Sequence, residues 1–292
     1  MSASDRADVY SRVTQEIITA IEAGDSRYRM PWHHDGAAVT RPINLTSGRP
    51  YRGINVVSLW AAAQAKGYAG GVWATFRQWQ AQGAQVRKGE KASLAVLWKD
   101  IRRDDDDAGE EGEEARARVF ARAFAVFNAD QVDGYAPAPK PVLPESERLA
   151  QAEAFIAALN IPVSFGAPYA YYHLVKDQVF LPDFAAFHDA HGFYATWLHE
   201  CAHATGAKHR LDRDFTGKWT KDALAMEEAT AELTASFLLA DLGIAHHPRE
   251  DHAAYVASWL RLLKDEPRAI FTAAGKAQAA ADWMHTRQPG AT

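Results

Sequence analysis

The chain has 292 residues, of which 48% are hydrophobic and 24% charged, and its formal net charge at pH 7 is −5. This composition is that of ordinary globular proteins, and the length suffices for two hydrophobic cores. No run of 18 apolar residues is present, which excludes a membrane-spanning helix of that kind. The start lacks the basic and apolar run of a signal peptide, and a single cysteine, Cys201, excludes an intrachain disulfide. These features predict a cytoplasmic protein.

The N-terminal part begins with helical patterns. Apolar residues recur every four positions from Val9 to Ile21, which predicts a first helix that ends at Gly24. After a turn-rich stretch, two further helices are predicted over residues 54–66 and 75–82. Each is followed by a glycine, the residue that most often ends a helix.

Two strands are predicted next, over residues 93–98 and 118–127, and the acidic run between them, 104–114, indicates a solvated hairpin loop. Along the second strand, arginine and phenylalanine alternate on one face, at Arg118, Phe120, Arg122 and Phe124. Stacked bases and phosphates suit such a face. A sheet packed on both faces, with two arginines at its rim, explains the pattern equally well.

Basic residues also gather beside aromatic residues in two turns. The stretch between Trp32 and Trp60 holds Arg41, Asn44, Arg49, Tyr51, Arg52 and Asn55. A second turn holds Arg87, Lys88 and Lys91. Such interleaving favours single-stranded over duplex nucleic acid, and a mild excess of positive charge in the first hundred residues agrees with that interpretation.

A proline-rich segment divides the chain. Four prolines between positions 136 and 144 cannot continue a helix or a central strand. We therefore predict an N-terminal domain over residues 1–135, a semi-rigid linker over 136–146 and a C-terminal domain over 147–292.

The C-terminal domain contains the motif His199-Glu200-Cys201-Ala202-His203. Residues four apart share one face of a helix, so His199 and His203 can bind the same metal ion. Glu200 lies beside them and is placed to act as a base on a water at the metal. Cys201 points away from that face and is most simply a packed thiol.

A zinc peptidase needs a third protein ligand and an open position for water. His209 completes the metzincin spacing after Gly206, but no methionine turn follows it. Glu228 lies on a second predicted helix with Glu232 one turn later, so one carboxylate can bind the metal and the other can hydrogen-bond a histidine ligand. We predict Glu228 as the third ligand, ahead of His209 and then Glu232. A solvated acidic face is the alternative for that helix considered alone.

Together these motifs resemble a known family. The N-terminal part is similar to the single-stranded DNA-binding domain of ArdC-type antirestriction proteins, which also occurs in TraC-type plasmid primases. That similarity is carried by Pro42-Ile43-Asn44, Tyr51-Arg52-Gly53-Ile54-Asn55, Trp73-Ala74-Thr75-Phe76 and Val86-Arg87-Lys88-Gly89-Glu90. The C-terminal part is similar to the zincin-like metallopeptidase domain of the same proteins, through His199-Glu200, His203, Arg210-Leu211, Arg213, Met226-Glu227-Glu228 and Ala231-Glu232-Leu233.

The resemblance implies an α+β fold of two domains, a mixed α/β single-stranded DNA-binding domain and a zincin-like domain built on the HExxH helix. It implies an antirestriction protein that binds single-stranded DNA and carries a zinc-dependent peptidase site, which protects incoming conjugative plasmid DNA from host restriction. One Zn²⁺ per chain is expected, and Mn²⁺ is another ion that the site could take. We expect DNA to be contacted by Arg41, Asn44, Tyr51, Arg52, Asn55, Trp73, Arg87, Lys88, Lys91, Arg118, Phe120 and Arg122.

In such a peptidase Glu200 would take a proton from water, and a strand predicted over residues 175–181 would align the substrate. The donor that stabilises the oxyanion is left open among Tyr255, His252 and Tyr194. One other hypothesis is a non-proteolytic protein that coats single-stranded DNA and keeps the zincin domain as a structural unit. Another is a DNA mimic that uses the acidic run 104–114, although one short loop does not reproduce the charge spacing of a duplex. The sequence identifies neither the peptide substrate nor the oligomeric state.

Overall fold

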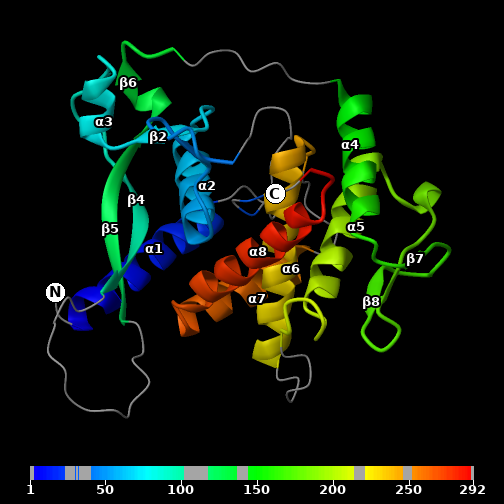
Figure 1. The fold of residues 1–292 in the computed structure, drawn as a ribbon. Helices are drawn as coiled ribbons and strands as arrows, with labels where there is room; N and C mark the ends of the chain where they lie inside the picture. The colour runs from blue at the N-terminus through cyan, green and yellow to red at the C-terminus, as the bar shows by residue number, and fades with distance from the viewer. Residues whose placement is uncertain are drawn as a thin grey trace, which may run out of the picture.

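The computed structural model describes residues 3–23, 30, 32, 41–101, 118–136, 144–213, 221–245 and 252–290 (Figure 1). The predicted acidic loop and most of the proline-rich linker lie outside these residues. No helix in the described ranges is both long and apolar enough to cross a membrane.

The N-terminal half combines three helices with a sheet. Its elements, in chain order, are α1 (Ala3–Ala23), β1 (Ile43–Asn44), α2 (Ile54–Lys66), β2 (Val72–Ala74), α3 (Phe76–Ala81), β3 (Gln85–Val86), β4 (Ser93–Ile101), β5 (Arg118–Asn128), a 3-10 turn (Ala129–Gln131) and β6 (Val132–Asp133). The predicted helices and the predicted hairpin are confirmed, and both strands of the hairpin are longer than the sequence indicated.

A four-stranded sheet of order β1-β2-β5-β4 organises this half. Its long β4–β5 hairpin is antiparallel, and β4 forms one edge of the sheet. Helix α2 lies along that edge, where the Asn55 amide both donates to the Val96 carbonyl, at 2.8 Å, and accepts from the Val96 N–H, at 2.7 Å. The edge groups at this position are therefore satisfied by a side chain instead of another strand.

The C-terminal half is mainly helical. Its elements are α4 (Glu145–Ala158), β7 (Val163–Ser164), β8 (Tyr171–His173), β9 (Gln178–Phe180), a 3-10 turn (Phe184–Ala186), α5 (Ala190–Thr205), α6 (Lys221–Leu242), α7 (His252–Asp265) and α8 (Ala269–Thr286). The three short strands form a sheet of order β7-β9-β8. The strand predicted over 175–181 is thus shorter, and it is central in its sheet rather than at an edge, because β7 and β8 pair with its two sides.

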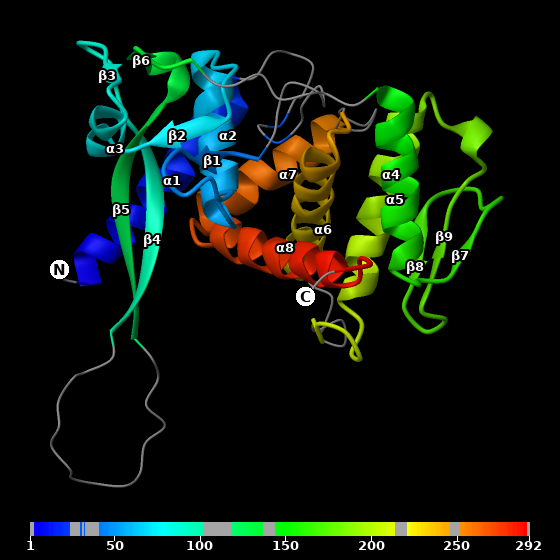
Figure 2. The ribbon, with the colours of Figure 1, turned by 45° about the horizontal axis from the view of Figure 1, so that its top comes forward.

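The two halves share one hydrophobic core. Helices α7 and α8 lie between the N-terminal elements and α5 (Figure 2), and one cluster of buried side chains runs from Val9 on α1 to Met284 on α8. The ring of Tyr10 packs edge-on against Phe271 with centroids 4.6 Å apart. Burial of apolar surface across this contact couples the stability of one half to that of the other.

Polar contacts reinforce the same interface. The Arg41 guanidinium, almost fully buried, lies 3.1 Å from Asp241 of α6 and 4.8 Å above the ring of Phe237. Gln278 of α8 accepts from the Gly53 N–H at 3.0 Å. Because α6 also carries Glu228, one of the helices that contact the N-terminal half also supplies a side chain to the site described next.

Candidate metal centre and its cleft

Helix α5 places His199 and His203 on one face. It begins at Asp189, whose carboxylate accepts from the Gly192 N–H at 2.8 Å. Leu198 and Cys201 on the opposite side are fully buried in the core. That burial fixes the rotation of the helix, so the two histidines, one turn apart, face α6.

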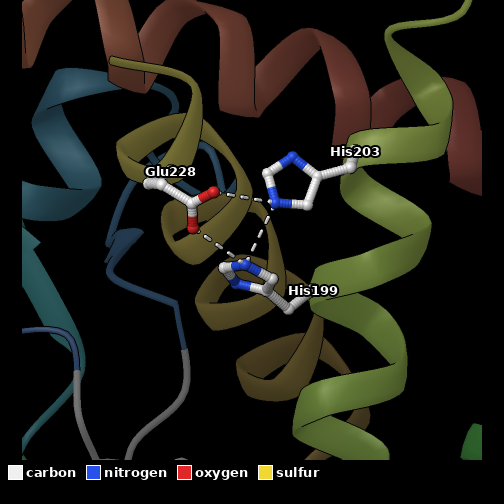
Figure 3. A group of neighbouring side chains, drawn as sticks. All are labelled: His199, His203 and Glu228. Carbon is white, nitrogen blue, oxygen red and sulfur yellow. Dashed lines mark hydrogen bonds and ion pairs between the residues drawn. The ribbon is translucent and has the colours of Figure 1, made fainter. Parts of the chain in front are cut away.

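Three side chains converge between α5 and α6 (Figure 3). The Nε2 atoms of His199 and His203 lie 3.2 Å apart. Glu228 brings Oε2 to 3.4 Å from His199 Nε2 and Oε1 to 3.5 Å from His203 Nε2. Among the described residues, these three form the one group of His, Cys, Asp or Glu ligand atoms that lie within 4.8 Å of one another.

The other ring nitrogen of each histidine lies beside a second carboxylate. His203 Nδ1 is 3.1 Å from Glu227 Oε1, and His199 Nδ1 is 3.4 Å from Glu232 Oε2. A carboxylate at Nδ1 holds the proton there and leaves Nε2 as a lone-pair donor, which is how metal-ligating histidines are usually oriented. Two such imidazoles and a carboxylate are a set of groups that could hold a divalent ion.

Glu227 is itself held by Arg213. The guanidinium donates from Nε to Oε2 at 3.0 Å and from Nη2 to Oε1 at 2.7 Å. It also donates to the Thr205 hydroxyl at 2.6 Å and the Ala202 carbonyl at 2.7 Å, both on α5. Burial favours the neutral acid, but the hydrogen bonds from His203 and Arg213 prevail and lower the pKa of Glu227. The carboxylate is therefore charged and fixed in place.

The site opens into a cleft of about 360 Å³. Glu200, only 6% exposed, lines it beside the histidines. The walls come from α6 and from the segment around β8, through Ala170, Tyr171, Tyr172, Leu174, Leu224, Glu227 and Glu228. Strand β8 is an edge strand, so its unpaired side is the one that a further strand can join.

His209 does not join the metal group. Its side chain is 63% exposed, and its Nε2 lies 3.3 Å from Asp177 Oδ2. Asp177 also accepts two hydrogen bonds from Arg210, at 2.6 and 2.8 Å. Although His209 has the metzincin spacing, it therefore belongs to an ion-pair network with Asp177 and Arg210.

Of the three residues suggested as oxyanion donors, the structure describes the side chain of Tyr194. Tyr194 is buried and its hydroxyl donates to Glu153 at 3.4 Å, and it does not line the cleft. The side chains of Tyr255 and His252 lie outside the described residues. Sequence reasoning missed Tyr172, which lines the cleft and donates to Asp177 at 2.7 Å. Burial and the nearby carboxylate raise the pKa of Tyr172 to about 12, so its hydroxyl keeps its proton.

Several predicted DNA-binding residues make contacts inside the protein. Arg41 and Asn55 hold the contacts with α6 and β4 given above, and Arg52 forms an ion pair with Asp282 of α8. Trp73 is fully buried in a small cluster with Val126. Arg41, Asn55 and Trp73 therefore stabilise the N-terminal half and its interface, whereas the Arg52 side chain is 62% exposed.

The remaining predicted DNA-binding residues differ in exposure. The Asn44 amide contacts the half-buried Tyr51 hydroxyl at 3.3 Å, and Arg87 donates to Glu90 at 3.0 Å. Lys88, Lys91 and Arg122 are exposed, whereas the side chains of Arg118 and Phe120 lie outside the described residues. Strand β5 packs on both faces, with Ala121 in the main core and Val126 in the smaller cluster. Between Ala121 and Val126, the strand therefore fits the alternative given for its alternating pattern, which is a sheet packed on both faces.

Comparison with family models matches both halves of the chain. Residues 7–127 match the N-terminal domain of anti-restriction factor ArdC, and residues 150–276 match a zincin-like metallopeptidase. Two further similarities are to proteins known from sequence. An uncharacterized protein of Sinorhizobium fredii, y4eC, is 56% identical over 97% of this chain and 94% of its own length. The DNA primase TraC of Escherichia coli is 35% identical over 94% of this chain, which corresponds to 27% of the primase.

Solved structures give the same result. The metal-free crystal structure of the antirestriction protein ArdC from plasmid R388 is 40% identical, with a TM-score of 0.76 over 96% of this chain and 97% of that chain. Its Mn(II)-bound structure is 39% identical, with a TM-score of 0.75 over 98% of this chain and 100% of that chain. With a zincin-like half, an ArdC-type half and this likeness over nearly the whole length, the chain belongs to the ArdC antirestriction family.

Proposed function

We propose that this chain binds single-stranded DNA and carries a working metal-dependent peptidase site, and that it protects incoming conjugative plasmid DNA from host restriction. The observation that carries the peptidase half of the proposal is the placement of Glu200 in the same cleft as the convergent group His199, His203 and Glu228. A purely structural metal site would need no carboxylate at position 200, because structural sites are closed by their ligands.

The metal would be held by the two Nε2 atoms and the Glu228 carboxylate. Zinc suits two imidazoles and one carboxylate, and the Mn(II)-bound relative supports a site that also accepts manganese. A divalent ion in this position would act as a Lewis acid on a carbonyl oxygen and make a nearby water more acidic.

Three glutamates of the chain would have the remaining roles in catalysis. Glu200 would accept a proton from a water in the cleft and transfer it to the departing amine. Glu227 and Glu232 would hold the His203 and His199 rings with their Nε2 atoms directed at the metal. The buried position of Glu200 excludes most solvent, which strengthens its interaction with a positively charged centre.

An extended peptide fits beside β8. The free edge of this strand borders the cleft, and its segment supplies Tyr171 and Tyr172 to the wall. Backbone pairing of a substrate with an edge strand positions the scissile bond through main-chain hydrogen bonds, which do not depend on the side chains of the substrate. We therefore expect the substrate to be bound in an extended conformation.

The DNA-binding half of the proposal rests on the family match of residues 7–127 and on the exposed cations of the N-terminal half, Lys88, Lys91 and Arg122. The relation to a plasmid primase and a plasmid antirestriction protein supports a role in DNA transfer. In conjugation the incoming plasmid is single-stranded, which is the form that exposed aromatic and basic side chains favour.

The test is Glu200→Gln in the full chain. This nearly isosteric change should preserve the fold, metal content and DNA affinity, while peptide cleavage falls by roughly 10²- to 10⁴-fold because the general base is lost. Glu147→Gln, at an exposed position on α4, is the matched control. In a conjugation assay into a restricting recipient, Glu200→Gln should fail to protect the plasmid. Full protection by Glu200→Gln would instead establish the non-proteolytic, DNA-coating alternative.

A further inference from the structure

A second hollow in the N-terminal half is lined by residues of α3, β3, β5 and β6. Figure 2 shows α3, β3 and β6 together at one end of this half. Its volume is about 490 Å³, and it is open to solvent. One wall carries two phenylalanines, Phe76 from α3 and Phe127 from β5. Phe76 is 41% exposed and belongs to none of the three clusters of buried residues.

The aromatic wall is built rigidly. Thr75 caps α3 by accepting from the Gln78 N–H, and the Gln78 side chain accepts from the Thr75 N–H, so the backbone at the start of α3, where Phe76 lies, is fixed. The Trp79 indole is fully buried and donates to the Phe127 carbonyl at 3.1 Å, which ties α3 to β5. The rings of Phe76 and Phe127 meet at 68° with centroids 6.3 Å apart. Phe76 is thus a partly exposed ring that lines the hollow in contact with Phe127.

Charged side chains also line the hollow. Arg87 follows β3 and is held by the protein, with Glu90 at 3.0 Å, Asp133 at 3.6 Å and a hydrogen bond to the Asp130 carbonyl. Lys88, the next residue, is exposed and precedes Gly89, whose φ of +91° makes the tight turn that presents the lysine. The two carboxylates repel a phosphate from this side of the hollow, while Lys88 attracts one at the rim.

From this arrangement we infer that the hollow is a nucleotide subsite, in which one base of a single-stranded DNA stacks on Phe76 and the adjoining phosphate contacts Lys88. The inference rests on the proposed DNA binding and names the side chains that carry it. A base has the size and the flat π-face that an exposed, fixed phenyl ring matches, and the ring does not distinguish one base from another. Phe127 supports the stacking ring from the side, and Arg87 keeps the Lys88 turn in position.

The experiment measures the affinity of the full chain for a fluorescein-labelled oligothymidylate by anisotropy, over a series of salt concentrations. Phe76→Leu retains apolar volume but removes the π-face, so affinity should fall roughly 5- to 100-fold with the salt dependence unchanged. Phe76→Trp should restore or exceed the parent affinity. Lys88→Ala should lower the magnitude of the salt slope by about 0.7, the value for one phosphate contact on a single strand.

Matched controls come from outside the hollow. Phe184→Leu removes another exposed phenyl ring, and Lys276→Ala removes an exposed cation of α8; both should bind like the parent. Circular dichroism and metal content show that each variant is folded. Parent-level binding by Phe76→Leu, while the parent binds well, would overturn the subsite and leave the proposed DNA binding intact. Absence of binding by the parent chain would overturn both.

Discussion

Removing the negative charge of Glu227 tests how the chain orients a histidine ligand. Glu227→Gln keeps the side-chain shape but removes the anion that pairs with Arg213 and with the Nδ1 proton of His203. Arg213 and Glu227 are both nearly buried, with 7% and 10% of their side chains exposed, so solvent does not replace the lost interaction. Arg213 would remain buried after losing this carboxylate, with the Thr205 hydroxyl and the Ala202 carbonyl among its acceptors.

The size of the effect follows from that burial. Breaking a buried ion pair by removing one partner typically costs about 3–5 kcal/mol. Because Arg213 keeps its bonds to Thr205 and Ala202, we expect the lower value, about 3 kcal/mol, for the free energy of unfolding. Loss of the carboxylate that orients a histidine ligand weakens metal binding roughly 10- to 100-fold.

Two measurements separate these effects. Urea unfolding of the metal-free full chain gives the stability change, and competition titration with a chelator gives the zinc affinity. Glu228→Gln is the matched control, because it removes a proposed ligand whose side chain is 41% exposed. It should lose metal affinity while the metal-free stability changes by less than about 1 kcal/mol. A Glu227→Gln variant with parent stability and parent zinc affinity would refute the orienting role.

Three further changes test other contacts. Burial alone would raise the pKa of Asp177, but the hydrogen bonds from Arg210 outweigh it and lower the pKa. The carboxylate therefore stabilises the fold above its ordinary pKa, and this contribution is lost as pH falls through the lowered value. In Asp177→Asn, the midpoint of unfolding should depend less on pH in the acidic range. Arg41→Met should lower the free energy of unfolding by about 1–3 kcal/mol, measured in urea, because the buried contact with Asp241 is lost. The Cys201 thiol, fully buried and with its pKa raised by burial, should react with a disulfide reagent only after denaturation, and rapid reaction of the native chain would contradict its placement in the core.

The parts of the site that follow helix geometry could be predicted from sequence. His199 and His203 share a face because they are one turn apart, and Glu228 and Glu232 do so on the next helix. The structure places Glu228 between the histidines and Glu232 behind one of them. Local spacing fixes these relations, and only the meeting of the two helices requires tertiary packing.

The parts that depend on long-range packing could not be predicted in the same way. Tyr172 reaches the cleft because β8 lies beside α5, which no local pattern indicates. The sequence predicts Arg41, Arg52 and Asn55 as DNA-binding residues, and it did not indicate their partners within the protein, which are Asp241, Asp282 and a strand edge. A polar side chain in a turn can bind either a ligand or a neighbouring helix or strand. Which of the two it binds depends on residues far away in the sequence. The shared core of the two halves escaped prediction for the same reason.

The most direct test of the central claim is the metal content of the full chain after dialysis against zinc. We predict one bound ion per chain for the parent and for His209→Ala, and near-complete loss for His203→Ala and Glu228→Ala. Glu200→Gln should retain the ion, because the base is not a ligand. Full occupancy in Glu228→Ala together with loss in His209→Ala would contradict the account and establish the metzincin ligand set.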